Sequence, residues 1–190
     1  MHAVHAVALC GLGPVVDGYS VVATTDHVAS AADESRAGSS FASFASSVRE
    51  KLVARFGSCL MTEHGRLPVC VDPSGTTDPH CFHAHFLMFP GITFPDESLT
   101  AYFLSQERAD SLDKALSLAR EHEEYFLFSQ DAQHFSVFVR PARIVRQFAR
   151  LLVADAIGKP ELANWRLYPR REDAVRSATA LREMFSKVGT

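Results

Sequence analysis

The feature that most constrains the fold is the run FHAHFLMFP at residues 82–90. Successive side chains of a β-strand point to opposite faces. One face of a strand here is entirely apolar, made by Phe82, Ala84, Phe86 and Met88. The other face carries His83 and His85, followed by Leu87 and Phe89. The run therefore predicts a strand that buries one face in a core and places two imidazoles side by side on the other.

Spacing of apolar residues predicts the remaining elements. Helices are expected at 41–56, ending at Gly57, at 112–119, after Pro141 and ending at 158–160, and at 175–185. Strands are expected at 19–24, from 58 into a turn at 62–65, and as a hairpin formed by 124–130 and 134–140. Residues 66–80 are rich in Pro, Gly, Ser and Thr and predict a loop. Antiparallel strands with helices packed on them define an α+β fold. We expect one domain over 1–190, with C-terminal helices (about 141–190) as an extension.

Composition narrows the class of protein. Hydrophobic residues make up 47% and charged residues 22% of the chain, as in ordinary globular proteins. No apolar run approaches the ~20 residues that span a bilayer, and the first residues do not resemble a signal peptide. The four cysteines form no CxxC pair, which favours reduced thiols. We expect a cytoplasmic protein with neither a membrane nor a nucleic-acid partner.

Two histidines on one strand face suit phosphoryl chemistry. The unperturbed imidazole pKa lies closer to neutrality than that of other side chains. One imidazole can attack phosphorus while its neighbour handles a proton on the leaving group. Ordinary core or surface histidines are the alternative interpretation of an isolated H-x-H.

Several segments together resemble the histidine-triad (HIT) superfamily. HAHFLMFP is similar to the family signature, in which alternating histidines on a strand precede apolar residues and often proline. GYSVVATTDHV resembles the early strand, with His27 at its histidine. TEHG (62–65) resembles the EHG of a bacterial branch, and RQFARLLVADAIGKPELANWRLYP resembles that branch's C-terminal helix and Asn/Asp-Trp-Arg segment.

The resemblance implies a HIT-like fold, a homodimer, and a nucleotide hydrolase or nucleotidyl transferase that acts on a nucleotide or nucleotide conjugate. His85 would attack the α-phosphate and form a nucleotidyl-histidine, and His83 would assist the leaving group. No cofactor or metal is implied. The substrate-binding candidates are Tyr19, His27, Glu63, His64, Ser74, Thr76, Leu87, Gln147 and Arg150.

The chain departs from the family pattern at several positions. The residue two or three before the first histidine, often Ser or Thr, is His80 or Cys81 here. Leu87 stands where the third histidine belongs, and Tyr19 stands where a fourth is common. The alternative function is therefore a degenerate HIT domain that binds a nucleotide without turnover.

Other chemistries stay open. The register Cys81-His83-His85 would make His83 the nucleophile. Cys81 itself is a possible nucleophile beside His83. Four residues are of the types that bind zinc, namely His64, Cys70, His80 and Cys81. Arg143, Arg146 and Arg150, spaced for one helix face, would either hold a polyphosphate or remain solvated.

Overall fold

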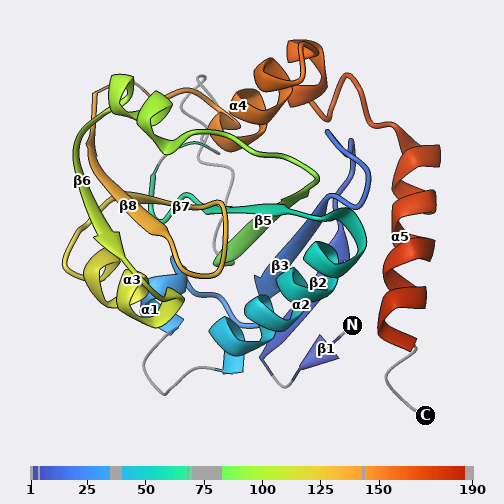
Figure 1. The fold of residues 1–190 in the computed structure, drawn as a ribbon, viewed down its shortest axis with the longest axis horizontal. Coiled ribbons are helices and arrows are strands. Elements are labelled where there is room, and N and C mark those ends of the chain that lie inside the picture. The colour runs from blue at the N-terminus through green and yellow to red at the C-terminus, as the bar shows by residue number, and fades with distance from the viewer. Residues whose placement is uncertain are drawn as a thin grey trace.

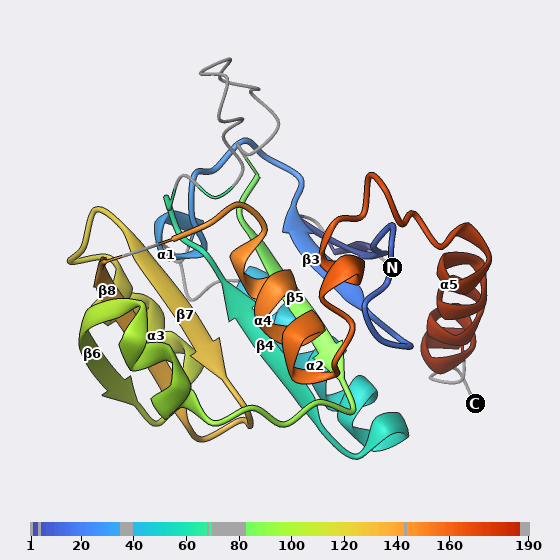
Figure 2. The ribbon, with the colours of Figure 1, turned by 90° about the horizontal axis from the view of Figure 1, so that it is seen from above.

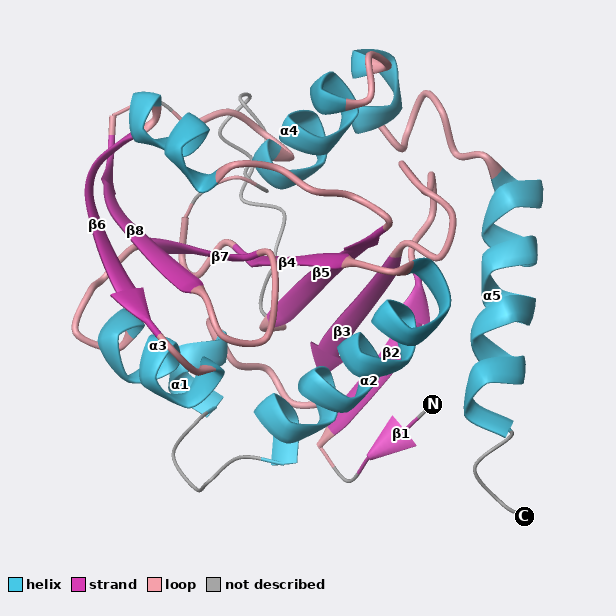
Figure 3. Ribbon diagram, viewed as in Figure 1, coloured by secondary structure: helices cyan, strands magenta, loops and turns pink. Residues whose placement is uncertain are grey.

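Eight strands pair side by side in one sheet, in the order β1-β2-β3-β5-β4-β7-β8-β6, and every ladder between them is antiparallel (Figures 1 and 3). The computed structural model describes residues 2–3, 5–34, 40–67, 69, 83–142 and 144–186. The strands are β1 (His2–Ala3), β2 (Ala6–Cys10), β3 (Ser20–Thr24), β4 (Cys59–Glu63), β5 (His85–Pro90), β6 (Phe103–Ala109), β7 (Tyr125–Ser129) and β8 (Phe135–Pro141).

Helices cover both faces of this sheet. They are α1 (Ala31–Glu34), α2 (Ser40–Phe56), α3 (Leu112–Ala119), α4 (Phe148–Ala156) and α5 (Arg171–Ser186), with short 3₁₀ helices η3 (Asp96–Ala101) and η4 (Pro160–Ala163). α1, α2 and α3 lie on one face, α4 lies on the other, and α5 stands beside β2 (Figures 1 and 2). The predicted α+β fold is confirmed. None of the helices within the described ranges is long and apolar enough to cross a lipid bilayer.

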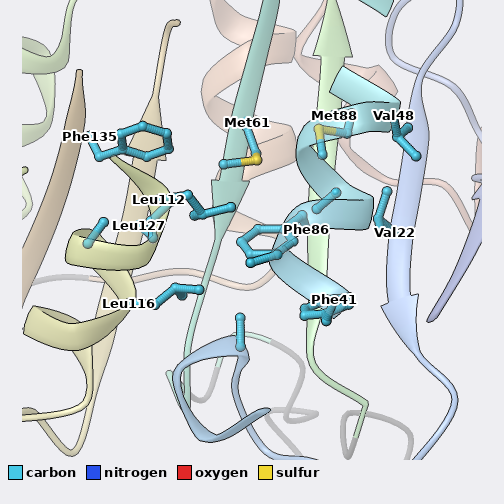
Figure 4. Close-up of a cluster of buried hydrophobic side chains, with 14 of the residues drawn as sticks. Val22, Phe41, Val48, Met61, Phe86, Met88, Leu112, Leu116, Leu127 and Phe135 are labelled. Atoms are coloured by element: carbon cyan, nitrogen blue, oxygen red, sulfur yellow. The ribbon is translucent and has the colours of Figure 1, made fainter. Parts of the chain in front are cut away.

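Strand β5 lies near the middle of the sheet and contributes to a core on each side. Phe86 and Met88 pack against α2 in the first core, beside Phe41 and Val48 (Figure 4). Phe89 and Leu87 belong to the second core, under α4. A fully buried Phe or Met side chain contributes about 1.5–3 kcal/mol. The alternation predicted from the sequence is thus correct for β5. The face that carries His85 is apolar at the next two positions on that face, Leu87 and Phe89.

The element predictions are confirmed for α2, α3, α5, β3, β4 and the β7–β8 hairpin. The helix expected directly after Pro141 begins only at Phe148, because Gln147 adopts a left-handed backbone conformation with φ 56°. Strands β2 and β6 were not anticipated. β6, with sequence FLSQERA, is a polar edge strand that pairs only with β8 among the described strands and lacks a continuous apolar face.

Candidate active site

Two histidines from neighbouring strands meet at the edge of a cavity. His85 opens β5, and its side chain points to the α4 face together with Leu87. In the β4–β5 ladder Thr62 pairs with Leu87, so continuing that register by two residues places His64 opposite His85. The two Nε2 atoms lie 3.2 Å apart, and the rings are nearly perpendicular at 78°. The site is therefore a pair of imidazoles brought together by strand register.

Hydrogen bonding fixes which nitrogen of His85 carries a proton. Its Nδ1–H donates to the backbone carbonyl of His83 over 2.9 Å, because a carbonyl oxygen only accepts. A neutral His85 then has its lone pair on Nε2. Burial lowers the pKa of His85, so the neutral form dominates at pH 7. This tautomer is the one that a nucleophile at Nε2 requires.

His64 is also held neutral. Burial, and second the neighbouring His85, lower its pKa to about 3. Because Nε2 of His85 carries no proton, the 3.2 Å contact requires His64 to be the donor, through its own Nε2–H. At neutral pH the cavity edge thus has one hydrogen-bond donor and one lone pair facing each other.

The residues on either side of His64 explain its fixed position. Glu63 points to the opposite face of the sheet, where its Oε1 accepts from the backbone N–H of Ala31 at the start of α1, over 3.3 Å. Burial raises the pKa of Glu63 to about 7. Gly65 has φ 50°, and a Cβ there would lie 2.8 Å from the ring of Tyr125. Glu63, predicted to bind substrate, does not line the cavity and instead anchors the turn.

The cavity has a volume of about 400 Å³, within the usual range of small-molecule sites. It opens between the sheet, the start of α4 and the chain around residue 165. Six of the predicted site residues line it together, namely Tyr19, His64, His85, Leu87, Gln147 and Arg150. Residues from four separate segments are thus gathered in one place.

Arg150 is buried in the cavity wall and already bound to the backbone. Its Nε donates to the carbonyl of Ala163 over 2.9 Å, and Nη2 donates to Gly13 and Leu162 over 2.6 and 2.9 Å. Its guanidinium also lies 5.2 Å from the Tyr19 ring centroid. Burial raises the pKa of Tyr19, while the charge and hydrogen bond of Arg150 lower it. Arg150 therefore ties η4 and the residue-13 loop to α4, besides placing a positive charge at the site.

Gln147 lines the cavity and directly precedes the first residue of α4. Its backbone N–H donates to the carbonyl of Val69 over 3.2 Å. Its side-chain Oε1 is buried without a hydrogen-bond partner among the described residues. A non-glycine residue in the left-handed region costs on the order of 1 kcal/mol or more, and such residues are enriched at functional sites. Gln147 thus lines the cavity with a left-handed backbone, and its amide oxygen has almost no accessible surface.

The remaining predicted residues lie elsewhere. His83 bonds through Nδ1 to the carbonyl of Thr24 over 3.1 Å and packs against His27 with ring centroids 4.4 Å apart. Neither residue lines the cavity, although both lie at the β3–β5 end next to it. Ser74 and Thr76 lie outside the described residues, as do Cys70, His80 and Cys81.

Sequence reasoning missed the apolar wall of the cavity. Leu9, Leu12 and Trp165 line its outer part. Trp165 is 36% exposed. In the ladders Leu9 pairs with Val21, and Val21 pairs with Leu87, so a row of apolar side chains crosses three strands. Alternation of polar and apolar residues in β2 would have indicated this row. The sequence of β2, AVALC, is apolar throughout and shows no such alternation.

Metal ligands are not grouped in the described part of the chain, where no three His, Cys, Asp or Glu side chains are placed to hold an ion. Three of the four zinc-ligand candidates fall outside that part, so the zinc alternative stays open.

Comparison with known proteins assigns no family. No family model matches the chain, and no curated protein matches it. The resemblance to the HIT superfamily therefore stays a prediction from the sequence, and the case for function rests on the geometry of the site.

Proposed function

We propose that this protein is a HIT-type nucleotide hydrolase or nucleotidyl transferase with His85 as its nucleophile. In the first step the Nε2 lone pair of His85 forms a bond to the α-phosphorus. The bond from phosphorus to the leaving group breaks, and its electron pair stays on the leaving group. In the second step water or another acceptor attacks phosphorus and loses its proton to solvent, and Nε2 leaves with its electron pair restored.

The observation that carries this proposal is the orientation of the His85 ring. Its Nδ1–H is bound to the carbonyl of His83, its Nε2 is directed at Nε2 of His64, and both histidines line the cavity together with Leu87. A backbone hydrogen bond of this kind sets the tautomer and restrains the ring. The ring is therefore held with its lone pair at the cavity edge, where it would meet the phosphorus of a bound nucleotide once the contact with His64 gives way.

The first turn of α4 offers a place for the phosphate. Leu151 N–H donates to the carbonyl of Gln147 over 3.0 Å, which starts the helical ladder. The three residues before Leu151, namely Phe148, Ala149 and Arg150, all line the cavity. The start of a helix carries partial positive charge and unpaired amides, which favour phosphate groups. The apolar row from Leu87 to Leu9 would then receive the base or an uncharged leaving group.

His83 has a less direct position than the sequence suggested. Its Nδ1 is bound to Thr24, which leaves Nε2 for a group extending past the cavity toward the end of β3. We therefore keep His83 as the residue that assists the leaving group, acting on a substrate larger than the cavity.

A binding module without turnover is the second candidate. It is favoured by the contact between Nε2 of His64 and Nε2 of His85, which occupies the nucleophilic lone pair, and by Leu87 at the third triad position. In that case the same cavity would hold a nucleotide, but no bond would form between Nε2 of His85 and the α-phosphorus.

A turnover and binding experiment separates the two candidates. Adenine and guanine nucleotides and their phosphoramidates are offered to the wild type, to His85→Ala, and to His134→Gln as a control. His134 is an exposed histidine paired with Asp131, far along the chain from the site. We expect slow turnover by the wild type and the control, none by His85→Ala, and nucleotide affinity within about tenfold in all three. Binding without turnover in the wild type would favour the binding module.

A further inference from the structure

We propose that His64 is the hydrogen-bond donor to the phosphoryl oxygen in this site, supplying from β4 the imidazole that β5 lacks at Leu87. The inference rests on the proposed function. It concerns a residue on a different strand from the histidine run, at a position fixed by register.

Strand register sets the position of His64 relative to His85. The Thr62–Leu87 pair in the β4–β5 ladder places His64 across from His85. Both His64 and Leu87 line the cavity. A group bonded to Nε2 of His85 would therefore lie within reach of Nε2 of His64, which is 3.2 Å from that nitrogen. An imidazole from β4 thus occupies the space beside the reacting atom.

Hydrogen bonding at His85 sets the place of the proton between the rings. The hydrogen bond from His85 Nδ1 to the His83 carbonyl leaves Nε2 of His85 unprotonated, so the proton between the rings belongs to Nε2 of His64. In the empty site this proton rests on the lone pair of His85. When a phosphate enters, the donor moves to a non-bridging oxygen and the lone pair becomes available for attack.

His64 acts as a donor and not as an acid. A neutral imidazole that gave up its Nε2 proton would become an anion, which a buried site disfavours. His64 therefore keeps its proton throughout, while the electron pair of the broken phosphorus bond stays with the leaving group. A neutral histidine that acts as a hydrogen-bond donor, rather than as an acid, is known from other enzymes.

The surroundings of His64 hold the donor in place. Glu63 is bonded to α1 and Gly65 packs closely against Tyr125, so both flanking residues are anchored on the face away from the cavity. A donor fixed in advance, where charge develops, stabilises a transition state more than a mobile one.

Two variants and two leaving groups test this role. His64→Ala removes the donor, whereas the amide N–H of His64→Gln replaces the Nε2–H. Each is assayed with a p-nitrophenyl ester of a nucleoside monophosphate, which needs no proton on leaving, and with an alkyl ester, which does. We expect His64→Ala to lose roughly 10²- to 10³-fold in kcat on both esters and His64→Gln to stay within about tenfold of the wild type. The thermal transition of each variant controls for folding.

Other results would overturn the role. If the loss in His64→Ala vanished on the p-nitrophenyl ester, His64 would be a proton donor to the leaving group. Equal losses in His64→Gln and His64→Ala, or no loss in either, would also reject an Nε2–H donor.

A measurement without substrate separates this inference from the proposed function. The ¹⁵N shifts of the imidazoles of the free protein should show His64 protonated at Nε2 and His85 protonated at Nδ1. The opposite tautomers would overturn the inference even if the protein turns over nucleotides. Absence of turnover in the wild type would instead reject the proposed function, and the catalytic role of His64 with it, even with the expected tautomers.

Discussion

The imidazole of His64 lies across the β4–β5 ladder from that of His85, with their Nε2 atoms 3.2 Å apart although the residues are 21 positions apart in sequence. The contact exists because both residues lie two positions beyond the Thr62–Leu87 pair, at the same end of the ladder. His85 is directed at the cavity by a carbonyl in its own strand, and His64 by the turn that follows β4.

The turn at Gly65 should be essential to this arrangement. Gly65→Ala places a Cβ 2.8 Å from Tyr125 at a positive φ, whereas Gly57→Ala has a positive φ and no atom within 4 Å. We expect Gly57→Ala to cost about 1 kcal/mol in unfolding free energy and Gly65→Ala about 2 kcal/mol or more. Urea unfolding measures both. Equal costs would show that the Tyr125 contact is unimportant.

The buried carboxyl of Glu63 should make stability depend on pH. Burial raises its pKa from 4.5 to about 7. The folded state then holds the proton more tightly, so the stability from Glu63 is complete below pH 4.5 and is lost as the pH rises through about 7. Glu63→Gln stays neutral. Its free energy of unfolding, relative to that of the wild type, should therefore rise by roughly 3 kcal/mol between about pH 4.5 and about pH 8.

This comparison isolates Glu63 from the two histidines of the site. Folding lowers the pKa values of His64 and His85, so their effect on stability has the opposite sign. The stability that they contribute is lost as the pH falls below about 6.5. Both variants contain these histidines, so the difference between wild type and Glu63→Gln removes their effect. A difference that does not vary with pH would show that Glu63 is ionised normally.

Restoring the third triad histidine should raise activity. Thr62 pairs directly with Leu87, and its hydroxyl is buried without a hydrogen-bond partner among the described residues. An imidazole from Leu87→His can bond to that hydroxyl, which offsets part of the roughly 1–3 kcal/mol cost of burying a polar group there. We expect a higher kcat/KM on ordinary nucleotide substrates. Thr62→Val in the same background should cancel part of the gain, and an unchanged kcat/KM in Leu87→His would refute the prediction.

The protein should form a homodimer. The apolar face of α2 does not require one, because Phe41, Phe44, Val48 and Leu52 are buried within the protomer. Apolar side chains are instead exposed on the segment between η4 and α5 and on α5 itself, where Leu167 is 72% and Val175 66% accessible. We expect light scattering at micromolar concentration to give twice the protomer mass, and Leu167→Asp to reduce it. A wild type that scatters as a monomer would contradict this prediction.

The sequence predicted strand β5 well because its two signals agree. Alternation placed Phe86 and His85 on opposite faces, and Pro90 ends the strand as observed. The same alternation bears on residues 63 and 64, since consecutive residues of one strand cannot both enter the cavity. The resemblance to the EHG motif covers both residues and does not distinguish the one that enters the cavity.

Other parts of the site depend on tertiary structure. The pairing of His64 with His85 follows from which strands are neighbours and in what register, and local spacing does not reveal either. The left-handed conformation of Gln147 shortens α4 at its start, although the apolar spacing from residue 144 is helical. Arg150 looks like a phosphate ligand in the sequence, yet three carbonyls from two distant segments hold its guanidinium.

The most direct test of the central claim is to find a nucleotide on His85. The wild type is mixed with adenine and guanine nucleotides, quenched in alkaline denaturant, and analysed by intact mass and peptide mapping. The account predicts an acid-labile adduct of one nucleoside monophosphate on His85, absent from His85→Ala and still formed by His83→Ala at a reduced rate. An adduct on His83 would support the other register of the motif. Nucleotide binding with no adduct and no turnover would contradict the claim and leave a binding module.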